Sequence, residues 1–77
     1  MKNFMITFRS VTYAQRGQKL LGRGTVVRTP RRLEQEGCGY GLKLRTEDAG
    51  PLLEALQAGE IPWKKVWLLE ETGEVML

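Results

Sequence analysis

The chemistry open to this chain centres on one sulfur atom. Cys38 is the only cysteine among the 77 residues, it lies between Gly37 and Gly39, and the chain contains no histidine. A Cys–His catalytic pair is therefore excluded. One cysteine without histidine cannot supply a typical zinc ligand set either, so we expect no metal site and no cofactor. What remains is a thiol that could act, as its thiolate, as a nucleophile or as a carrier of a transferable group.

Two interpretations of Cys38 remain open at this stage. The flanking glycines would leave the sulfur accessible and would let a bound group approach the backbone closely. A lone cysteine can equally be an inert, small, buried apolar residue. The preceding segment adds to the uncertainty, because Glu36, or the C-terminal end of a short helix over residues 30–36, would raise the pKa of the thiol.

The composition indicates what kind of protein contains this cysteine. Hydrophobic residues make up 42% of the chain, charged residues 27%, and the net charge is +3. These values are typical of a folded domain, and the length predicts a single domain over residues 1–77. One cysteine cannot form an internal disulfide, which favours a reducing compartment. The N-terminus lacks the long apolar core of a secretory signal and no apolar run reaches the ~20 residues of a membrane span, so we expect a cytoplasmic protein without membrane association.

Hydrophobic periodicity predicts the elements that position Cys38. Residues alternate as in half-buried strands in four segments, and two segments have helical spacing. Ser10 is a favourable N-cap for the first helix, and Thr46 to Asp48 form a start signal for the second. A short extra strand over residues 75–77 could follow, and residues 30–36 are left open between loop and helix. Strands are expected over residues 4–9, 24–29, 40–45 and 63–70, and helices over 11–21 and 51–58.

This order predicts an α+β fold, the ferredoxin-like split βαβ (βαββαβ) sandwich, in which a four-stranded antiparallel sheet carries two helices on one face. One face of the sheet would pack against leucines of the two helices. The other face would be exposed and could form a dimer or partner surface. The expected core is Phe4, Ile6, Phe8, Leu20, Leu21, Leu42, Leu44, Leu52, Leu53, Leu56, Val66 and Leu68; the expected open face is Met5, Thr7, Lys43, Arg45, Trp67 and Leu69.

In this topology the connection that contains Cys38 lies at the end of the sheet where the first helix begins. Arg9 would lie near Cys38, because the first and third strands are neighbours. Arginines and helix N-termini lower the pKa of a thiol. The same end would gather half of the twelve basic residues, namely Arg9, Arg28, Arg31, Arg32, Lys64 and Lys65.

Three short motifs resemble one known family. They are I-T-F-R-S at residues 6–10, V-V-x-T-P-R at 26–31 and C-G-x-x-L at 38–42. Together they resemble the small bacterial selenium/sulfur carrier-like proteins. The resemblance implies a stand-alone protein, not an enzyme by itself, whose cysteine holds sulfur or selenium as a persulfide or selenosulfide and exchanges it with donor and acceptor proteins. The motif matches and the topology together make Cys38 the candidate carrier, with Arg9, Ser10, Thr29, Pro30, Arg31 and Gly39 as candidate binding residues.

Two alternatives stay open beside the carrier. One is a protein–protein interaction or regulatory module that forms a homodimer through the open sheet face. The other is RNA binding, since Gly39-Tyr40-Gly41 partly matches the central strand motif of RNA-recognition domains. That match is poor, because Cys38 stands where Lys or Arg is expected and Leu42 replaces an aromatic residue. Tyr40 also alternates with core leucines, so we do not expect a nucleic-acid partner.

Overall fold

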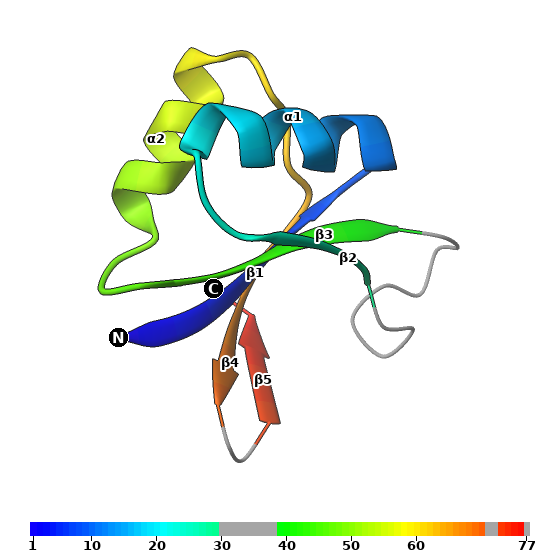
Figure 1. Cartoon of the computed structure of the whole chain (residues 1–77). Coiled ribbons are helices and arrows are strands. Elements are labelled where there is room, and N and C mark those ends of the chain that lie inside the picture. The colour runs from blue at the N-terminus through cyan, green and yellow to red at the C-terminus, as the bar shows by residue number, and fades with distance from the viewer. Residues whose placement is uncertain (30–38, 71–72, 77) are drawn as a thin grey trace.

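The computed structural model describes residues 1–29, 39–70 and 73–76. Two helices lie on one face of an antiparallel sheet whose strand order is β2-β3-β1-β4-β5 (Figure 1). The elements are β1 (Lys2–Phe8), α1 (Val11–Leu21), β2 (Thr25–Arg28), β3 (Tyr40–Thr46), α2 (Gly50–Ala58), β4 (Val66–Glu70) and β5 (Gly73–Met76).

The predicted α+β fold is confirmed. The strands β4, β1, β3 and β2 lie in the order that the βαββαβ arrangement requires. The sheet is nevertheless larger than the four strands expected, because β5 pairs antiparallel with β4 and adds a fifth strand at that edge. The extra strand suggested for residues 75–77 thus exists, at Gly73–Met76.

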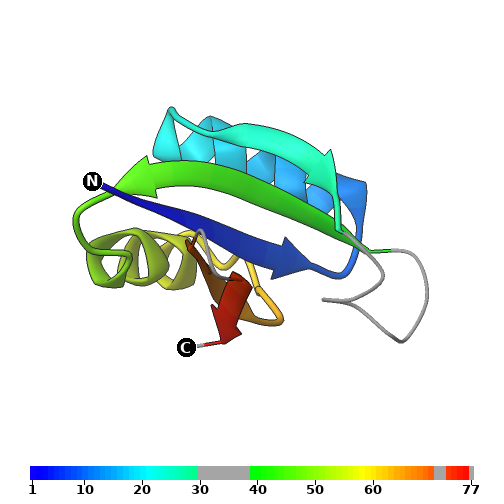
Figure 2. The same ribbon diagram turned by 90° about the horizontal axis from the view of Figure 1, so that it is seen from below.

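Strand β1 is the centre of the sheet. It pairs with β3 along its whole length, from Lys2 opposite Thr46 to Phe8 opposite Tyr40. On its other side it pairs with β4, from Asn3 opposite Leu69 to Ile6 opposite Val66. Figure 2 shows β2, β3 and β1 running side by side. Because β1 has a partner on both sides, its backbone hydrogen bonds are made within the sheet.

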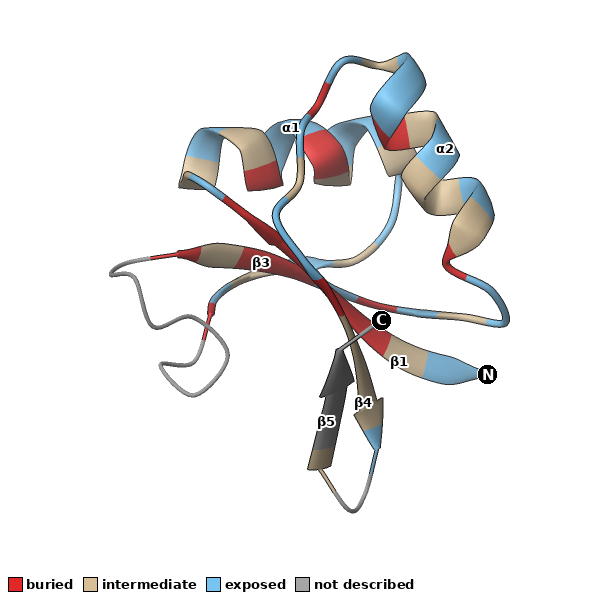
Figure 3. Ribbon diagram, turned by 180° about the vertical axis from the view of Figure 1, so that it is seen from behind, coloured by how far each residue is buried: buried red, intermediate tan, exposed pale blue. Residues whose placement is uncertain are grey.

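The open sheet face is more enclosed than expected, and much of β1 and β3 is coloured as buried in Figure 3. Met5 and Thr7 were expected to be exposed, but only 5% and 1% of their surfaces are accessible, and Trp67 and Leu69 are half-buried. One reason is Gly41 in the neighbouring strand. A Cβ atom placed on Gly41 would lie 3.0 Å from Cγ of Met5, so the missing side chain makes room for Met5 to lie flat across β3. The exposed part of this face is reduced to residues such as Lys43 and Arg45.

Helix α1 packs on the sheet through its smallest residues. Ala14 and Gly17 are its buried positions, and a Cβ on Gly17 would lie 3.1 Å from Cζ of Phe8 and 3.3 Å from Cδ2 of Leu56. The glycine therefore allows the helix to approach both β1 and α2 closely. Leu20 was expected in the core, but it is 47% exposed and its side chain lies over Gly59.

Helix α2 begins one residue before the predicted range of 51–58. Its first residue is Gly50, and Asp48 remains outside, where its Oδ1 accepts a hydrogen bond from the Gly50 N–H at 2.9 Å. Among the described elements, α2 makes close backbone contacts with α1 and not with the strands. Leu56 is its fully buried residue, whereas Leu52 and Leu53 are half-buried at the border of the core.

None of the helices in the described part of the chain is long and apolar enough to cross a membrane.

The close approach at Gly17 is testable by overpacking. Gly17→Leu should lower the free energy of unfolding by about 1–3 kcal/mol, because the new side chain has no room between Phe8 and Leu56. Arg16→Leu is the matched control, since Arg16 is exposed on the same helix. It should change the stability by less than about 0.5 kcal/mol. Urea unfolding monitored by circular dichroism measures both, and equal stabilities of the two variants would contradict the packing described.

Candidate functional site

Four of the predicted site residues meet at one end of the sheet. The Thr29 N–H donates a hydrogen bond of 3.0 Å to the carbonyl oxygen of Gly39, which continues the β2–β3 pairing beyond Arg28 and Tyr40. On the other side, Phe8 pairs with Tyr40, so Arg9 follows the end of the strand next to Gly39. Gly39 is thus flanked by the ends of β2 and β1. The remaining predicted site residues, Pro30, Arg31 and Cys38, lie outside the described residues.

Arg9 and Ser10 give this end positive character. Arg9 is exposed, and Ser10 is the N-cap of α1, with extended backbone angles and an Oγ that accepts the Tyr13 N–H at 3.4 Å. The N-terminus of a helix carries a partial positive charge that favours anions nearby. A thiolate or another anion beside Gly39 would therefore be stabilised by the guanidinium charge and by the helix dipole.

Thr29 is buried, and its hydroxyl group makes no hydrogen bond to the described residues. Only 6% of its surface is accessible, and its Oγ1 has no hydrogen-bond partner among the residues that the structure describes. The oxygen lies 3.3 Å from where a Cβ on Gly41 would be, so it faces β3, the strand that follows Gly39. A buried hydroxyl without a partner costs about 1–3 kcal/mol, and such groups are uncommon in stable folds. This hydroxyl is available as a donor to a group bound next to Gly39.

The sequence did not reveal that Thr7 fixes the backbone of Lys64 and Lys65 at this end of the sheet. Thr7 and Lys65 form a compact set of hydrogen bonds: the Thr7 N–H donates to the Lys65 carbonyl at 2.8 Å, and the Lys65 N–H donates to Thr7 Oγ1 at 2.9 Å. The Lys64 N–H donates to the Thr7 carbonyl at 2.7 Å. These bonds hold both lysines at the end of the sheet where Arg9 lies. The alternation of β1 placed Thr7 on an exposed face, so no sequence signal revealed this role.

Charge is distributed unevenly along the sheet. Arg9, Lys64 and Lys65 lie at the end where β1 finishes. Glu47 follows β3 at the opposite end, where its Oε1 lies 3.7 Å from the N-terminal ammonium group of Met1. The basic end is therefore the natural place for an anionic ligand.

Tyr40 does not lie on the open sheet face. It is half-buried and packs against the hydrophobic core. In an RNA-recognition domain the corresponding aromatic residue must be free to stack on a base. The position of Tyr40 therefore gives no support to RNA binding.

The two buried threonines provide a matched test of this description. Thr29→Val should leave the free energy of unfolding unchanged or raise it by about 1 kcal/mol, because it removes an unpartnered hydroxyl. Thr7→Val should lower it by about 1–3 kcal/mol, because it leaves the Lys65 N–H without its side-chain acceptor. Urea unfolding measures both. An equal loss in the two variants would show that the Thr29 hydroxyl does have a partner.

Comparison with known proteins agrees with the motifs in the sequence. The profile of the family described as "Putative Se/S carrier protein-like" matches residues 3–68. No curated protein and no solved structure matches the chain. The family match begins in β1 and ends in β4, so it includes both helices and the end of the sheet described above. The chain belongs to the Se/S carrier-like family.

Proposed function

We propose that this protein carries sulfur or selenium on Cys38, as a persulfide or a selenosulfide. The observation that carries the proposal is the family match over residues 3–68, which includes the only cysteine of the chain. A free thiol that must stay reduced suits the cytoplasm, where we place the protein.

The transfer needs a donor that is itself a persulfide. The Cys38 thiolate attacks the terminal sulfur of the donor, a new S–S bond forms, the donor S–S bond breaks, and the donor leaves as its thiolate. The total oxidation level is unchanged, because the sulfane sulfur passes from one thiol to another. Selenium follows the same course from a donor selenosulfide. An acceptor nucleophile then takes the terminal atom, and Cys38 is released as a thiolate.

The described residues have roles that fit this chemistry. Arg9 and the N-terminus of α1 favour the thiolate and the anionic persulfide. Ser10 holds that helix end in place as its N-cap. The Thr29 hydroxyl, buried and unpartnered, is a donor for the terminal sulfur or selenium atom. Gly39 was expected to leave the backbone accessible, but it is buried, and its carbonyl oxygen accepts the Thr29 N–H, so its role is to fix the backbone next to the cysteine. Pro30 and Arg31 complete the motif that contains Thr29.

A direct test is the mass of the protein after exposure to a donor. Incubation with glutathione persulfide should add the mass of one sulfur atom to the wild-type protein, and dithiothreitol should remove it. Cys38→Ser, which keeps the size of the side chain, should gain nothing. Thr29→Val should gain the sulfur but lose it faster, because the terminal atom lacks its hydrogen-bond donor. A wild-type protein that never retains the sulfur would refute the carrier function.

The proposed electrostatics of the thiol can be measured separately. The rate of alkylation by iodoacetamide as a function of pH should give Cys38 a pKa below the free value of ~8.5. Arg9→Gln should raise that pKa towards the free value, because it removes the neighbouring positive charge. Arg16→Gln is the control, since it removes an exposed arginine from the middle of α1. Identical pKa values in all three proteins would exclude a role for Arg9.

A further inference from the structure

A groove separates α2 from the side of β4 that faces the helices. It has a volume of about 660 Å³ and is lined by residues from the start of β1, the start of α2, and β4 with the segment before it. The groove lies where the backbone of α2 comes close to α1 but to none of the described strands, and the β4–β5 hairpin extends away from both helices (Figure 1). A volume of this size lies within the ~300–1,000 Å³ range of pockets that hold small molecules.

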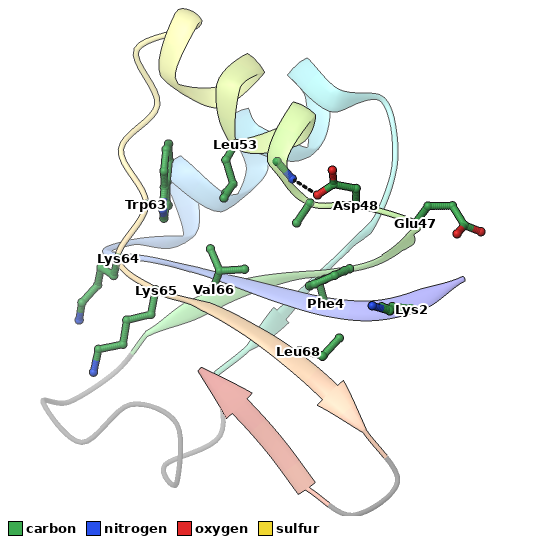
Figure 4. Close-up of a pocket in the computed structure, with 12 residues that line it drawn as sticks. Lys2, Phe4, Glu47, Asp48, Leu53, Trp63, Lys64, Lys65, Val66 and Leu68 are labelled. Carbon is green, nitrogen blue, oxygen red and sulfur yellow. Dashed lines mark hydrogen bonds between the residues drawn. The ribbon is translucent and has the colours of Figure 1, made fainter. Parts of the chain in front are cut away.

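The middle of the groove is apolar. Phe4 and Val66 form its floor and are almost completely buried, whereas Leu53, Trp63 and Leu68 are half-buried around it. In Figure 4 these five side chains surround the same space, with contributions from β1, α2 and β4. An aromatic ring and branched aliphatic side chains around a partly open space favour an apolar ligand body.

The two ends of the groove differ in charge (Figure 4). Lys64 and Lys65 line one end, and both carboxylates that line the groove, Glu47 and Asp48, lie at the other together with Lys2. Those carboxylates have local partners: Glu47 lies 3.7 Å from the N-terminal ammonium group, and Asp48 accepts the Gly50 N–H at 2.9 Å. At the lysine end, Lys65 is exposed at the mouth of the groove, where its positive charge favours an anionic head group.

The lysine end is also held rigidly. The backbone N–H groups of Lys64 and Lys65 donate to the carbonyl and hydroxyl oxygens of Thr7, at 2.7 and 2.9 Å. Thr7 itself is 1% exposed in the central strand. The backbone of this end is thus fixed, whereas the exposed lysine side chains extend from it at the mouth of the groove, where an ammonium group can meet the head group of a ligand.

We propose that this groove binds a small amphipathic monoanion, whose apolar body lies against Phe4, Val66 and Leu68 and whose carboxylate is bound by Lys65. The site is separate from the proposed carrier function. It uses none of the predicted site residues, so binding does not depend on Cys38.

Decanoate, below its micelle concentration, is a suitable probe. Binding is followed by the fluorescence of Trp63 in a Trp67→Phe background, because Trp67 is the other tryptophan of the chain and does not line the groove. Amide chemical-shift mapping locates the ligand. Saturable binding is expected, with the largest shifts at Leu53, Trp63 and Leu68 and weaker binding at higher salt. The cation decylammonium should bind more weakly than decanoate.

Two variants test the two halves of the proposal. Lys65→Glu should weaken decanoate binding about fivefold or more, since it reverses the charge that faces the carboxylate. Lys43→Glu makes the same charge change at an exposed position of β3 outside the groove, and it should leave the affinity unchanged. Leu53→Trp fills the groove and should abolish binding while circular dichroism shows a folded protein. Cys38→Ala should bind as the wild type does.

Several results would overturn the proposal. They are absence of decanoate binding, equal affinities in Lys65→Glu and Lys43→Glu, preferred binding of decylammonium, or retained binding in folded Leu53→Trp. Sedimentation showing that Leu53→Trp converts a dimer to a monomer would also overturn it, because a second copy of the chain would then occupy the groove. Loss of persulfide formation in Cys38→Ser with normal decanoate binding would leave this proposal intact and would concern the carrier alone.

Discussion

The structure depends on the burial of β1 on both of its faces. Five consecutive residues, from Phe4 to Phe8, are buried. Phe4, Ile6 and Phe8 face the helices, and burial of each such side chain contributes about 1.5–3 kcal/mol. Met5 and Thr7 are enclosed on the opposite face, where Gly41 makes room for one and Lys65 provides hydrogen bonds for the other. Because β1 pairs with both β3 and β4, it fixes the positions of these two strands. Through them it also fixes the candidate carrier site and the groove.

The candidate carrier site and the groove begin from the same end of this strand. The last pair of β1 with β3 positions Gly39, and the hydrogen bonds of Thr7 position Lys64 and Lys65. The two regions nevertheless use different chemistry. Around Gly39 a cationic side chain, a helix N-terminus and a buried hydroxyl suit a soft anion, whereas the groove combines an apolar floor with charged residues at its two ends.

Much of the architecture could be predicted from the sequence. The bounds of α1 were predicted to the residue, because Ser10 and Gly22 are clear capping residues at its two ends. The order of strands followed from the β-α-β-β-α-β succession of elements. Alternation failed for β1 itself, since a pattern of apolar and polar residues does not reveal that a polar residue such as Thr7 is buried and hydrogen-bonded within the fold.

The site was less predictable than the fold, for a physical reason. Arg9, Ser10, Thr29 and Gly39 could be gathered at one end by topology alone. The unpartnered state of the Thr29 hydroxyl depends on which atoms surround it, and the groove depends on how far α2 stands from β4. Both are properties of tertiary packing between residues distant in the chain. The placement of α2 also explains why Leu52 and Leu53, which were predicted as core residues, lie only at the border of the hydrophobic core.

The lengths of the strands also affect the tendency of the protein to aggregate through the edges of its sheet. The two seven-residue strands, β1 and β3, are interior, and the sheet is bordered by the four-residue strands β2 and β5. Exposed sheet edges invite unwanted strand pairing and aggregation, and short edges reduce that hazard. A fifth strand covering β4 is therefore a protective addition to the four-stranded plan, because it replaces an apolar edge containing Trp67 and Leu69 with a shorter one that includes a glycine and a glutamate.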